Sequence, residues 1–274
     1  MTDFLRRLLR TPQGFLGSVI VGLILIAVAL GQWLTPYGPA DMQALARYGT
    51  PSVEHWLGTD QYGRDILSRL LDGTRSTVVM ALLATFIGTL GGAVLGTGSA
   101  YLGGRADEFI MRTVDAVMAI PSLLLALLVV SLLGSSSANA LLAIAIAFMP
   151  SMARISRSVA LAVRKQDYVS AAIARGESST YIILREMLPN VIAPIVVEMT
   201  IRVSFAVMLF ATLSFLGLGA QPPATDWGLM VSEARQYLHR SYWILLWPSA
   251  AIALTAIGFN LLGDGLRDAL NPRT

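Results

Sequence analysis

Long apolar runs, separated by short polar connections, make up most of the chain. A helix needs about 20 apolar residues to cross a hydrocarbon core of about 30 Å. Six runs reach that length, at about 15–34, 78–102, 113–133, 138–161, 191–216 and 243–263. Charged residues make up 14% of the chain, against roughly 25% in a soluble domain, and they gather between the runs. The pattern predicts an all-α, polytopic membrane protein with six transmembrane helices in contact with membrane lipid.

The basic residues predict how these helices are oriented. With the N-terminus in the cytoplasm, thirteen lysines and arginines lie on that side of the spans and six lie on the other side. Because basic residues are retained on the cytoplasmic side of a membrane, we expect both termini in the cytoplasm.

The first apolar run allows a second interpretation. It follows three arginines and contains a small-residue pattern at 27–29 that resembles a signal-peptide cleavage site. The run from Phe15 is nevertheless long enough to span, and Trp33 and Tyr37 could anchor its end at the interface. We expect a retained span, and cleavage would leave five helices with the other connections unchanged.

Small residues and prolines predict how several runs pack. In the second run, small residues recur at every fourth position: Ala84, Gly88, Gly92, Gly96 and Ala100. Such a ridge lets another helix approach closely. Three prolines fall inside or near the ends of the third, fourth and fifth runs: Pro121, Pro150 and Pro194. Each removes a backbone donor and favours a kink.

The connection 35–77 contains a short stretch with helical spacing. After Asp60, which can cap a helix, Ile66 and Leu70 share one face and Arg69 lies opposite. This pattern is typical of a helix that lies at the membrane interface. Such a helix could seal the outer ends of the spans or contact an external partner.

The composition excludes several kinds of chemistry. The chain has no cysteine, so it can hold no disulfide or thiolate metal site, and two histidines are too few for a histidine-rich one. Its only lysine, Lys165, does not lie in a glycine-rich phosphate-binding loop. The arginines flank apolar runs, so no nucleic acid is expected. We expect no metal, no cofactor and no enzymatic activity, and any transport energy must come from a separate ATPase or an ion gradient.

The polar segment between the fourth and fifth runs predicts two short helices. The first, 167–175, ends at Gly176, which can adopt the left-handed conformation of a helix end. Ser178 or Ser179 can cap the second, which we expect to stop at Leu188, before a proline. This arrangement offers a compact knob of small side chains to another protein.

The segment resembles the EAA loop of ABC importer permeases, whose pattern is Glu-Ala-Ala, three residues, Gly and, about a dozen residues later, Leu-Pro. The matching residues are Ala171, Ala172, Gly176, Leu188 and Pro189, and Ser170 stands in the place of the Glu. In that family the loop forms a coupling helix that docks into the ATPase subunit. The resemblance implies that these residues and Ala174 contact an ATPase. Ser170 removes a carboxylate that could form a salt bridge there, but it leaves the docking shape.

Three further stretches, 55–65, 214–228 and 259–268, narrow the resemblance. In this order they are similar to the C-type permease subunit of dipeptide, oligopeptide and nickel importers, and the likeness covers about 53–272. It implies an ABC type I importer permease fold in the bacterial plasma (inner) membrane. The implied partners are a homologous second permease subunit, two ATP-binding cassette ATPase subunits and an extracytoplasmic substrate-binding protein.

On this interpretation the chain has two parts. Residues 1–77 form the first transmembrane helix and an extracytoplasmic connection with the interfacial helix. Residues 78–274 form a five-helix permease core with a cytoplasmic coupling loop at 162–190. Members of the family carry dipeptides, longer peptides, glutathione, nickel chelates and some sugars. Di- or oligopeptides are the expected substrates, although the sequence does not select among these classes.

Two charges in the fifth run are candidates for the transport pathway. Glu198 and Arg202 stand one helical turn apart and can neutralise each other. Charges at membrane depth are costly unless they are paired or face water. The two residues could form an internal pair at a helix interface. They could instead line the translocation path, where they would meet the charged termini of a peptide.

Two other kinds of membrane protein also fit the hydropathy. One is an ion-coupled secondary transporter, and the other is a membrane scaffold or channel subunit. The chain shows no inverted repeat and few acidic residues within the runs, which argues against the first. The leading hypothesis is a permease subunit that forms half of a pathway and is driven by a separate ATPase.

Overall fold

The computed structural model describes residues 2–270, with side chains described from residue 6. This part of the chain is built of helices and contains no β-strand. In chain order the elements are α1 (Thr2–Arg10), α2 (Pro12–Leu34), η1 (Ala44–Ala46), α3 (Ile66–Leu102), α4 (Gly104–Met118), α5 (Ser122–Leu133), α6 (Ser137–Val163), α7 (Asp167–Ala174), α8 (Ser179–Tyr181), η2 (Ile182–Met187), α9 (Leu188–Phe215), α10 (Trp227–Ala234), η3 (Arg235–Tyr237) and α11 (Trp243–Leu270).

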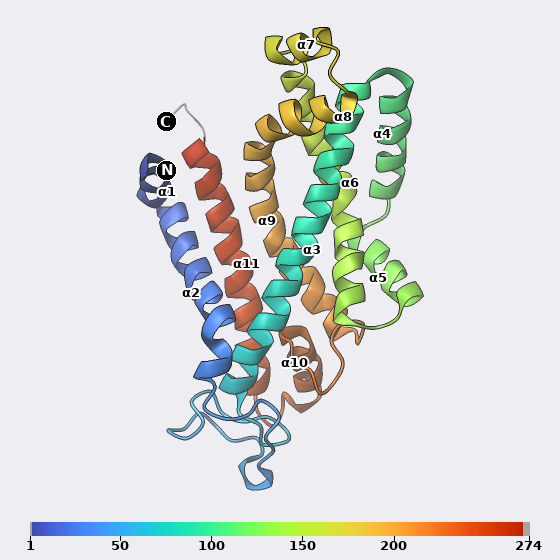
Figure 1. The fold of residues 1–274 in the computed structure, drawn as a ribbon. Helices are drawn as coiled ribbons and strands as arrows, with labels where there is room; N and C mark the ends of the chain where they lie inside the picture. Colours follow the sequence, from blue (N-terminus) through green and yellow to red (C-terminus); the bar gives the residue numbers. More distant parts are fainter. Residues whose placement is uncertain (1, 271–274) are drawn as a thin grey trace.

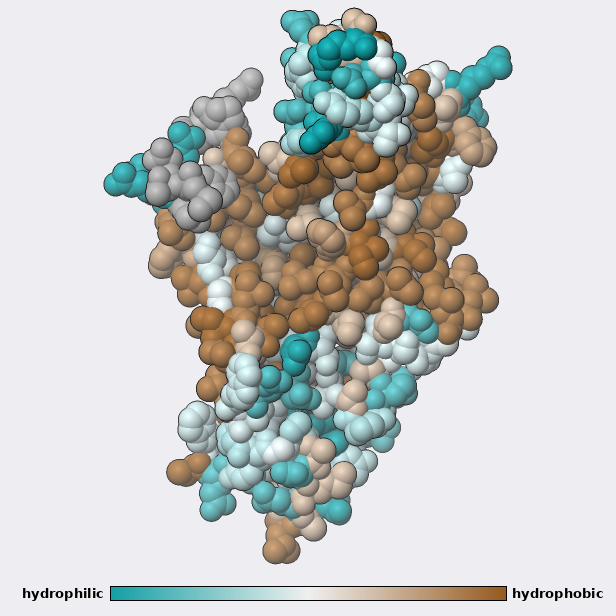
Figure 2. Space-filling view, viewed as in Figure 1, coloured by the Kyte–Doolittle hydropathy of each residue, from teal (hydrophilic) through white to brown (hydrophobic). Residues whose placement is uncertain are grey.

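Five helices are long and apolar enough to cross a membrane: α2, α3, α6, the continuous helix Ser179–Phe215 and α11. The pair α4 and α5 supplies a sixth crossing if its two halves are counted together. Figure 2 shows hydrophobic side chains in a broad band around the middle of one face, with hydrophilic side chains at both ends. The predicted all-α polytopic fold is confirmed.

The third predicted span, 113–133, bends near Pro121, where the sequence favours a kink, and the bend divides it into two helices. α4 ends at Met118 and α5 begins at Ser122, and the two helices are bent by 88° at the break. Pro121 has no N–H to continue the helical ladder, and its ring disfavours a helical conformation at Ile120. The run is therefore continuous in hydropathy but broken in structure.

The helices form one bundle around α3. α3 packs along α6 and also contacts α2 and α9, while α11 packs against α2 and α9. Figure 1 shows α7 at one end of the bundle, with α1 and the last turns of α11. We call this the α7 end. The opposite end, called the α10 end, carries α10 and the connection between α2 and α3.

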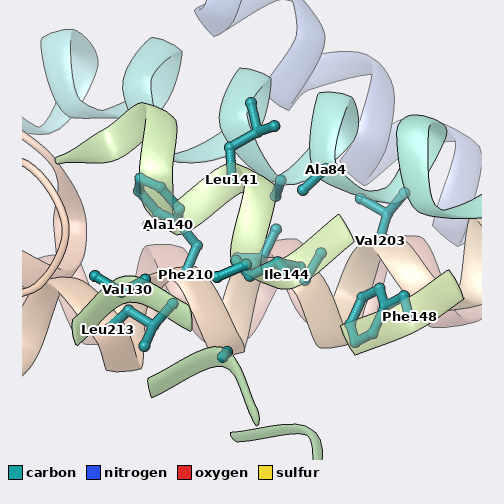
Figure 3. Packing of buried hydrophobic residues seen from close by; sticks show 14 of the residues in the cluster. Ala84, Val130, Ala140, Leu141, Ile144, Phe148, Val203, Phe210 and Leu213 are labelled. Atoms are coloured by element: carbon teal, nitrogen blue, oxygen red, sulfur yellow. The ribbon is translucent and has the colours of Figure 1, made fainter. Parts of the chain in front are cut away.

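Small residues bring α3 and α6 into close contact, which confirms the predicted ridge. A Cβ added to Gly96 would lie 2.1 Å from the carbonyl oxygen of Ala153. One added to Gly88 would lie 2.7 Å from that of Ala145. Figure 3 shows the adjoining core, where Ala84 of α3, side chains of α6 and Phe210 of α9 pack together.

The separate interfacial helix expected after Asp60 is not present. Ile66 instead begins α3, and Asp65 caps it by accepting a hydrogen bond from the N–H of Ser68 at 2.8 Å. Asp60 shapes the preceding turn through the N–H groups of Tyr62 and Arg64. The stretch 66–102 holds no proline, and the helix runs uninterrupted through Gly73 into the second span.

The second helix of the polar segment does not stop at Leu188, as the sequence had suggested. η2 is a turn of π-helix, in which the N–H of Leu188 bonds to the carbonyl of Ile183, five residues back. Pro189 then falls in the first turn of α9, where a missing N–H is tolerated. The chain changes direction at this point and continues as α9 (Figure 1).

Candidate functional site

One face of α7 packs against the rest of the chain at the α7 end. Val169 and Ala172, three residues apart, are fully buried and join a hydrophobic cluster with Ile182 and Met187 of η2. Residues three apart lie on the same side of a helix. This contact therefore fixes which face of α7 points outward.

The outward side of α7 is exposed and carries both small and large side chains. The small exposed residues are Ser170, Ala171, Ala174 and, just after the helix, Gly176, and we call this surface the α7 knob. Tyr168 and Ile173 are exposed beside it. The other residues of the predicted coupling loop lie differently. Ala172 is in the core, Leu188 is half-buried and Pro189 is exposed at the start of α9.

The turn after α7 is held by its own backbone. Gly176 has φ +76°, a left-handed conformation that favours glycine. The N–H of Gly176 bonds to the carbonyl of Ile173 at 3.0 Å, and the N–H of Glu177 bonds to that of Ala172 at 3.2 Å. These two bonds form a Schellman motif at the end of α7. A Cβ on Gly176 would meet no atom within 4 Å, so the glycine borders open space.

The second candidate pair lines a cavity on the side of the bundle that α4, α5, α6 and α9 form. The cavity has a volume of about 560 Å³ and is walled by the break between α4 and α5, by α6 and by α9. Glu198 and Arg202 of α9 contact each other at 3.2 Å, and their side chains are 25% and 18% exposed. They therefore border a hollow lined by their own subunit.

Arg202 is poorly satisfied in this position. A guanidinium carries five N–H donors. The Nε of Arg202 is buried and has no hydrogen-bond partner within residues 2–270. Its guanidinium also lies 5.8 Å from the ring centre of Phe148, which is within the range of a cation–π contact. The pair therefore keeps capacity for a further polar contact.

Comparison with known proteins identifies the family of the chain. Residues 88–274 match the family model described as the binding-protein-dependent transport system inner membrane component. Residues 1–51 match the N-terminal TM domain of oligopeptide transport permease C. The chain belongs to the binding-protein-dependent transport permeases.

Relatives align over nearly the whole permease. A probable D,D-dipeptide transport system permease of Escherichia coli is 41% identical over 96% of this chain and 88% of its own length. A glutathione transport system permease of Pectobacterium atrosepticum is 41% identical over 99% of this chain and 90% of its own length. A dipeptide transport system permease of Alkalihalophilus pseudofirmus is 38% identical over 98% of this chain and 88% of its own length.

These likenesses decide the class of protein. The chain is a multi-pass permease subunit of a binding-protein-dependent ABC importer of the inner membrane. The predicted resemblance to the dipeptide and oligopeptide permeases is confirmed. The alternatives of an ion-coupled transporter and of a scaffold or channel subunit are set aside.

At the α10 end of the permease, the sequence pattern did not reveal a buried charge network. Asp60 Oδ2 accepts hydrogen bonds from Arg64 Nε at 2.6 Å and from Arg69 Nη1 at 2.7 Å. Glu233 Oε2, on α10, accepts from the same two arginines at 2.9 Å each. The network ties α10 to the start of α3. Spacing could suggest a bond between Asp60 and Arg64, but no local signal points to Glu233.

Two further ion pairs hold α4 against α6. Arg157 of α6 donates to both carboxylate oxygens of Asp107, from Nε at 2.6 Å and from Nη2 at 2.5 Å. Arg154 of α6 contacts Asp115 of α4. Val114 is the one buried residue of α4, so these ion pairs form a large part of its attachment.

Proposed function

We propose that the chain forms half of the translocation pathway of an importer for di- or oligopeptides. In this proposal a homologous permease supplies the other half, two ATP-binding cassette subunits hydrolyse ATP and an extracytoplasmic binding protein delivers the peptide. The chain itself is no enzyme and holds no cofactor. The peptide substrate is supported by the names of the relatives, which include dipeptide transport permeases.

The α7 knob is the proposed docking site for the ATPase. Its support is the combination of small exposed side chains with a rigid base, since Val169 and Ala172 are fully buried beneath it. The Schellman turn presents Gly176 next to open space. A surface of this kind can enter a cleft in another protein without first reorganising. Leu188, at the start of α9, packs against the same hydrophobic cluster, whereas Pro189 is exposed.

The proposed orientation places the α7 end in the cytoplasm and the α10 end outside. Both chain termini are then cytoplasmic. The support is the distribution of basic residues, which favours the connections at the α7 end. In this orientation the connection between α2 and α3 meets the binding protein and the α7 knob meets the ATPase.

The cavity beside Glu198 and Arg202 is the proposed part of the pathway within this subunit. Broken helices at membrane depth are tolerated where they line a cavity, and they mark substrate sites in other transporters. The break between α4 and α5 forms one wall of this cavity. Glu198 and Arg202 on the facing wall give the cavity charged groups at a depth where lipid offers no polar partner.

Single cysteines can test the orientation, since the chain has none of its own. Ala174→Cys lies on the α7 knob, and Val53→Cys lies on the α2–α3 connection, where the native side chain is 93% exposed. In intact spheroplasts, a membrane-impermeant maleimide should label Val53→Cys and leave Ala174→Cys unlabelled. After the membrane is permeabilised, both should react. The reverse pattern would overturn the orientation.

The same variants test the docking site. In purified membranes, assembly with the ATPase subunits should protect Ala174→Cys from the maleimide, because the knob is then covered. The matched control is Val53→Cys, whose labelling rate should not change when the ATPase binds. Equal labelling of Ala174→Cys with and without the ATPase would place the contact elsewhere.

A further inference from the structure

The pathway cavity is lined by one acidic side chain, one basic side chain and an apolar wall. Glu198 and Arg202 are the charged residues that line it. The wall around them includes Met118, Met208 and Phe205. Its volume of about 560 Å³ lies within the range of about 300–1,000 Å³ that is typical of small-molecule sites.

Arg202 differs from the buried arginines that have a structural role. Arg64 and Arg69 each contact two carboxylates at 2.6–2.9 Å. Arg157 binds both oxygens of Asp107. Arg202 instead makes a single ion-pair contact, at 3.2 Å. The Nε atoms of Arg202 and Arg69 are both buried without a partner in the described chain, so the difference between them lies in the number of carboxylates that each contacts. Some N–H donors of the Arg202 guanidinium are therefore free to bind a second anion.

The spacing of the two charges suits a short peptide. Side chains at i and i+4 of a helix have Cβ atoms about 5–6 Å apart. The ends of an extended dipeptide span about 7 Å, at roughly 3.3–3.6 Å per residue. One dipeptide can therefore place its ammonium group at Glu198 and its carboxylate at Arg202.

We propose that this cavity is a subsite for short zwitterionic peptides, in which Glu198 binds the terminal ammonium group and Arg202 binds the terminal carboxylate. The inference rests on the proposed function, since it assumes that peptides pass through this subunit. Each ligand charge replaces half of the resting pair, so neither side chain is left unpaired when the peptide enters or leaves. The methionines adapt their shape to different peptide side chains. The subsite therefore recognises the termini that all such peptides share.

A charge swap separates recognition from structure. Glu198→Arg combined with Arg202→Glu keeps an i, i+4 pair but reverses its direction in the cavity. In proteoliposomes that contain the whole transporter and its binding protein, the swap should assemble and melt like the wild type. ATP-driven uptake of L-alanyl-L-alanine should fall by about tenfold or more, as expected when one charge-assisted hydrogen bond is lost. Arg112→Gln, which breaks an exposed pair outside the cavity, should leave uptake unchanged.

Direct binding gives a second measurement. Saturation-transfer NMR on the membrane and ATPase subunits, without the binding protein, should detect L-alanyl-L-alanine. It should not detect the N-acetylated, C-amidated peptide, which carries neither charge. Arg202→Gln should abolish the signal of the free dipeptide. Equal signals from both peptides would overturn the subsite.

The outcomes distinguish the subsite from the function on which it rests. If the wild-type transporter imports the dipeptide and the charge swap imports it equally well, the subsite is wrong and the importer assignment stands. If the wild type imports no peptide in the presence of ATP and its binding protein, the proposed function fails. In that case the NMR comparison still decides whether the cavity binds a zwitterion.

Discussion

Arg69 donates a hydrogen bond to Glu233 over 2.9 Å, which joins two residues 164 positions apart in the chain. The same arginine donates to Asp60 at 2.7 Å, and the side chains of Arg69 and Asp60 are only 4% and 1% exposed. One buried guanidinium thus connects the α2–α3 connection, the start of α3 and α10. The position of α10 depends on this charge network as well as on apolar packing.

Replacing Arg69 should destabilise the permease strongly. Arg69→Met keeps much of the side-chain volume but leaves Asp60 and Glu233 to share Arg64. We expect the free energy of unfolding to fall by about 2–3 kcal/mol, the range for hydrogen bonds to charged groups whose partners stay buried. The measurement is denaturant unfolding of the detergent-solubilised subunit. The control is Arg112→Met. The side chains of Arg112 and its partner Glu108 are 78% and 58% exposed, so this ion pair should contribute less than about 0.5 kcal/mol to stability. Equal losses in the two variants would contradict the role of the network.

The contact between α3 and α6 gives a matched pair of glycine substitutions. Gly96→Ala would place a Cβ 2.1 Å from the carbonyl oxygen of Ala153, so the two helices must separate. We expect a loss of about 1–3 kcal/mol, typical of overpacking. Gly98→Ala, two residues further along the same helix, meets no atom within 4 Å and should be neutral or stabilising by up to about 1 kcal/mol. The melting temperatures of the two variants should move in opposite directions or differ by several degrees. Similar shifts would mean that α6 tolerates bulk at this ridge.

This ridge was predictable because its signal is local. A four-residue period of small side chains places them on one face of a helix, whatever the rest of the chain does. Hydropathy likewise predicted the five unbroken spans. The helix end at Gly176 was also predictable, since the left-handed conformation there favours one residue type.

Other features depend on geometry that local patterns do not contain. Pro121 indicates a kink in the run 113–133, but neither the proline nor the hydropathy gives its size, which is 88° in the structure. Pro189 was expected to end a helix, but the π-turn before it places the proline in a first helical turn, where it fits. The partner of Arg69 on α10 is set by tertiary packing alone.

The buried N-cap of α10 should make stability depend on pH. Asp226 is fully buried and accepts a hydrogen bond from the N–H of Leu229 at 2.9 Å. Burial raises the pKa of the Asp226 carboxyl above its usual range, although the N–H of Leu229 acts in the opposite direction. The folded state therefore holds this proton more tightly than the unfolded state. Its contribution to stability is present at low pH and is lost as the pH rises through the raised pKa.

Asp226→Asn isolates that contribution. Asparagine caps helices as well as aspartate does, but it cannot ionise. We expect the melting temperature of the variant, relative to wild type, to rise as the pH increases from about 4 to about 7, because only the wild type then buries a charge. The measurement is thermal unfolding in detergent at several pH values. A difference between the two proteins that does not change with pH would show that Asp226 does not titrate in this range.

The α7 knob should tolerate bulk in the isolated permease but not in the assembled transporter. A side chain at Gly176 would project into open space, so Gly176→Trp should fold with only the cost of a left-handed backbone, about 1–2 kcal/mol. In proteoliposomes with the ATPase and binding protein, the indole should block the docking cleft, and both uptake and substrate-stimulated ATP hydrolysis should fall severalfold or more. Gly176→Ala carries the same backbone strain without the bulk and should keep most of its activity. Gly217→Trp, at an equally open glycine with φ +79° after α9, carries a similar backbone strain away from the α7 knob and should keep its coupling between uptake and ATP hydrolysis. Near-normal coupling in Gly176→Trp would mean that the ATPase docks elsewhere on the permease.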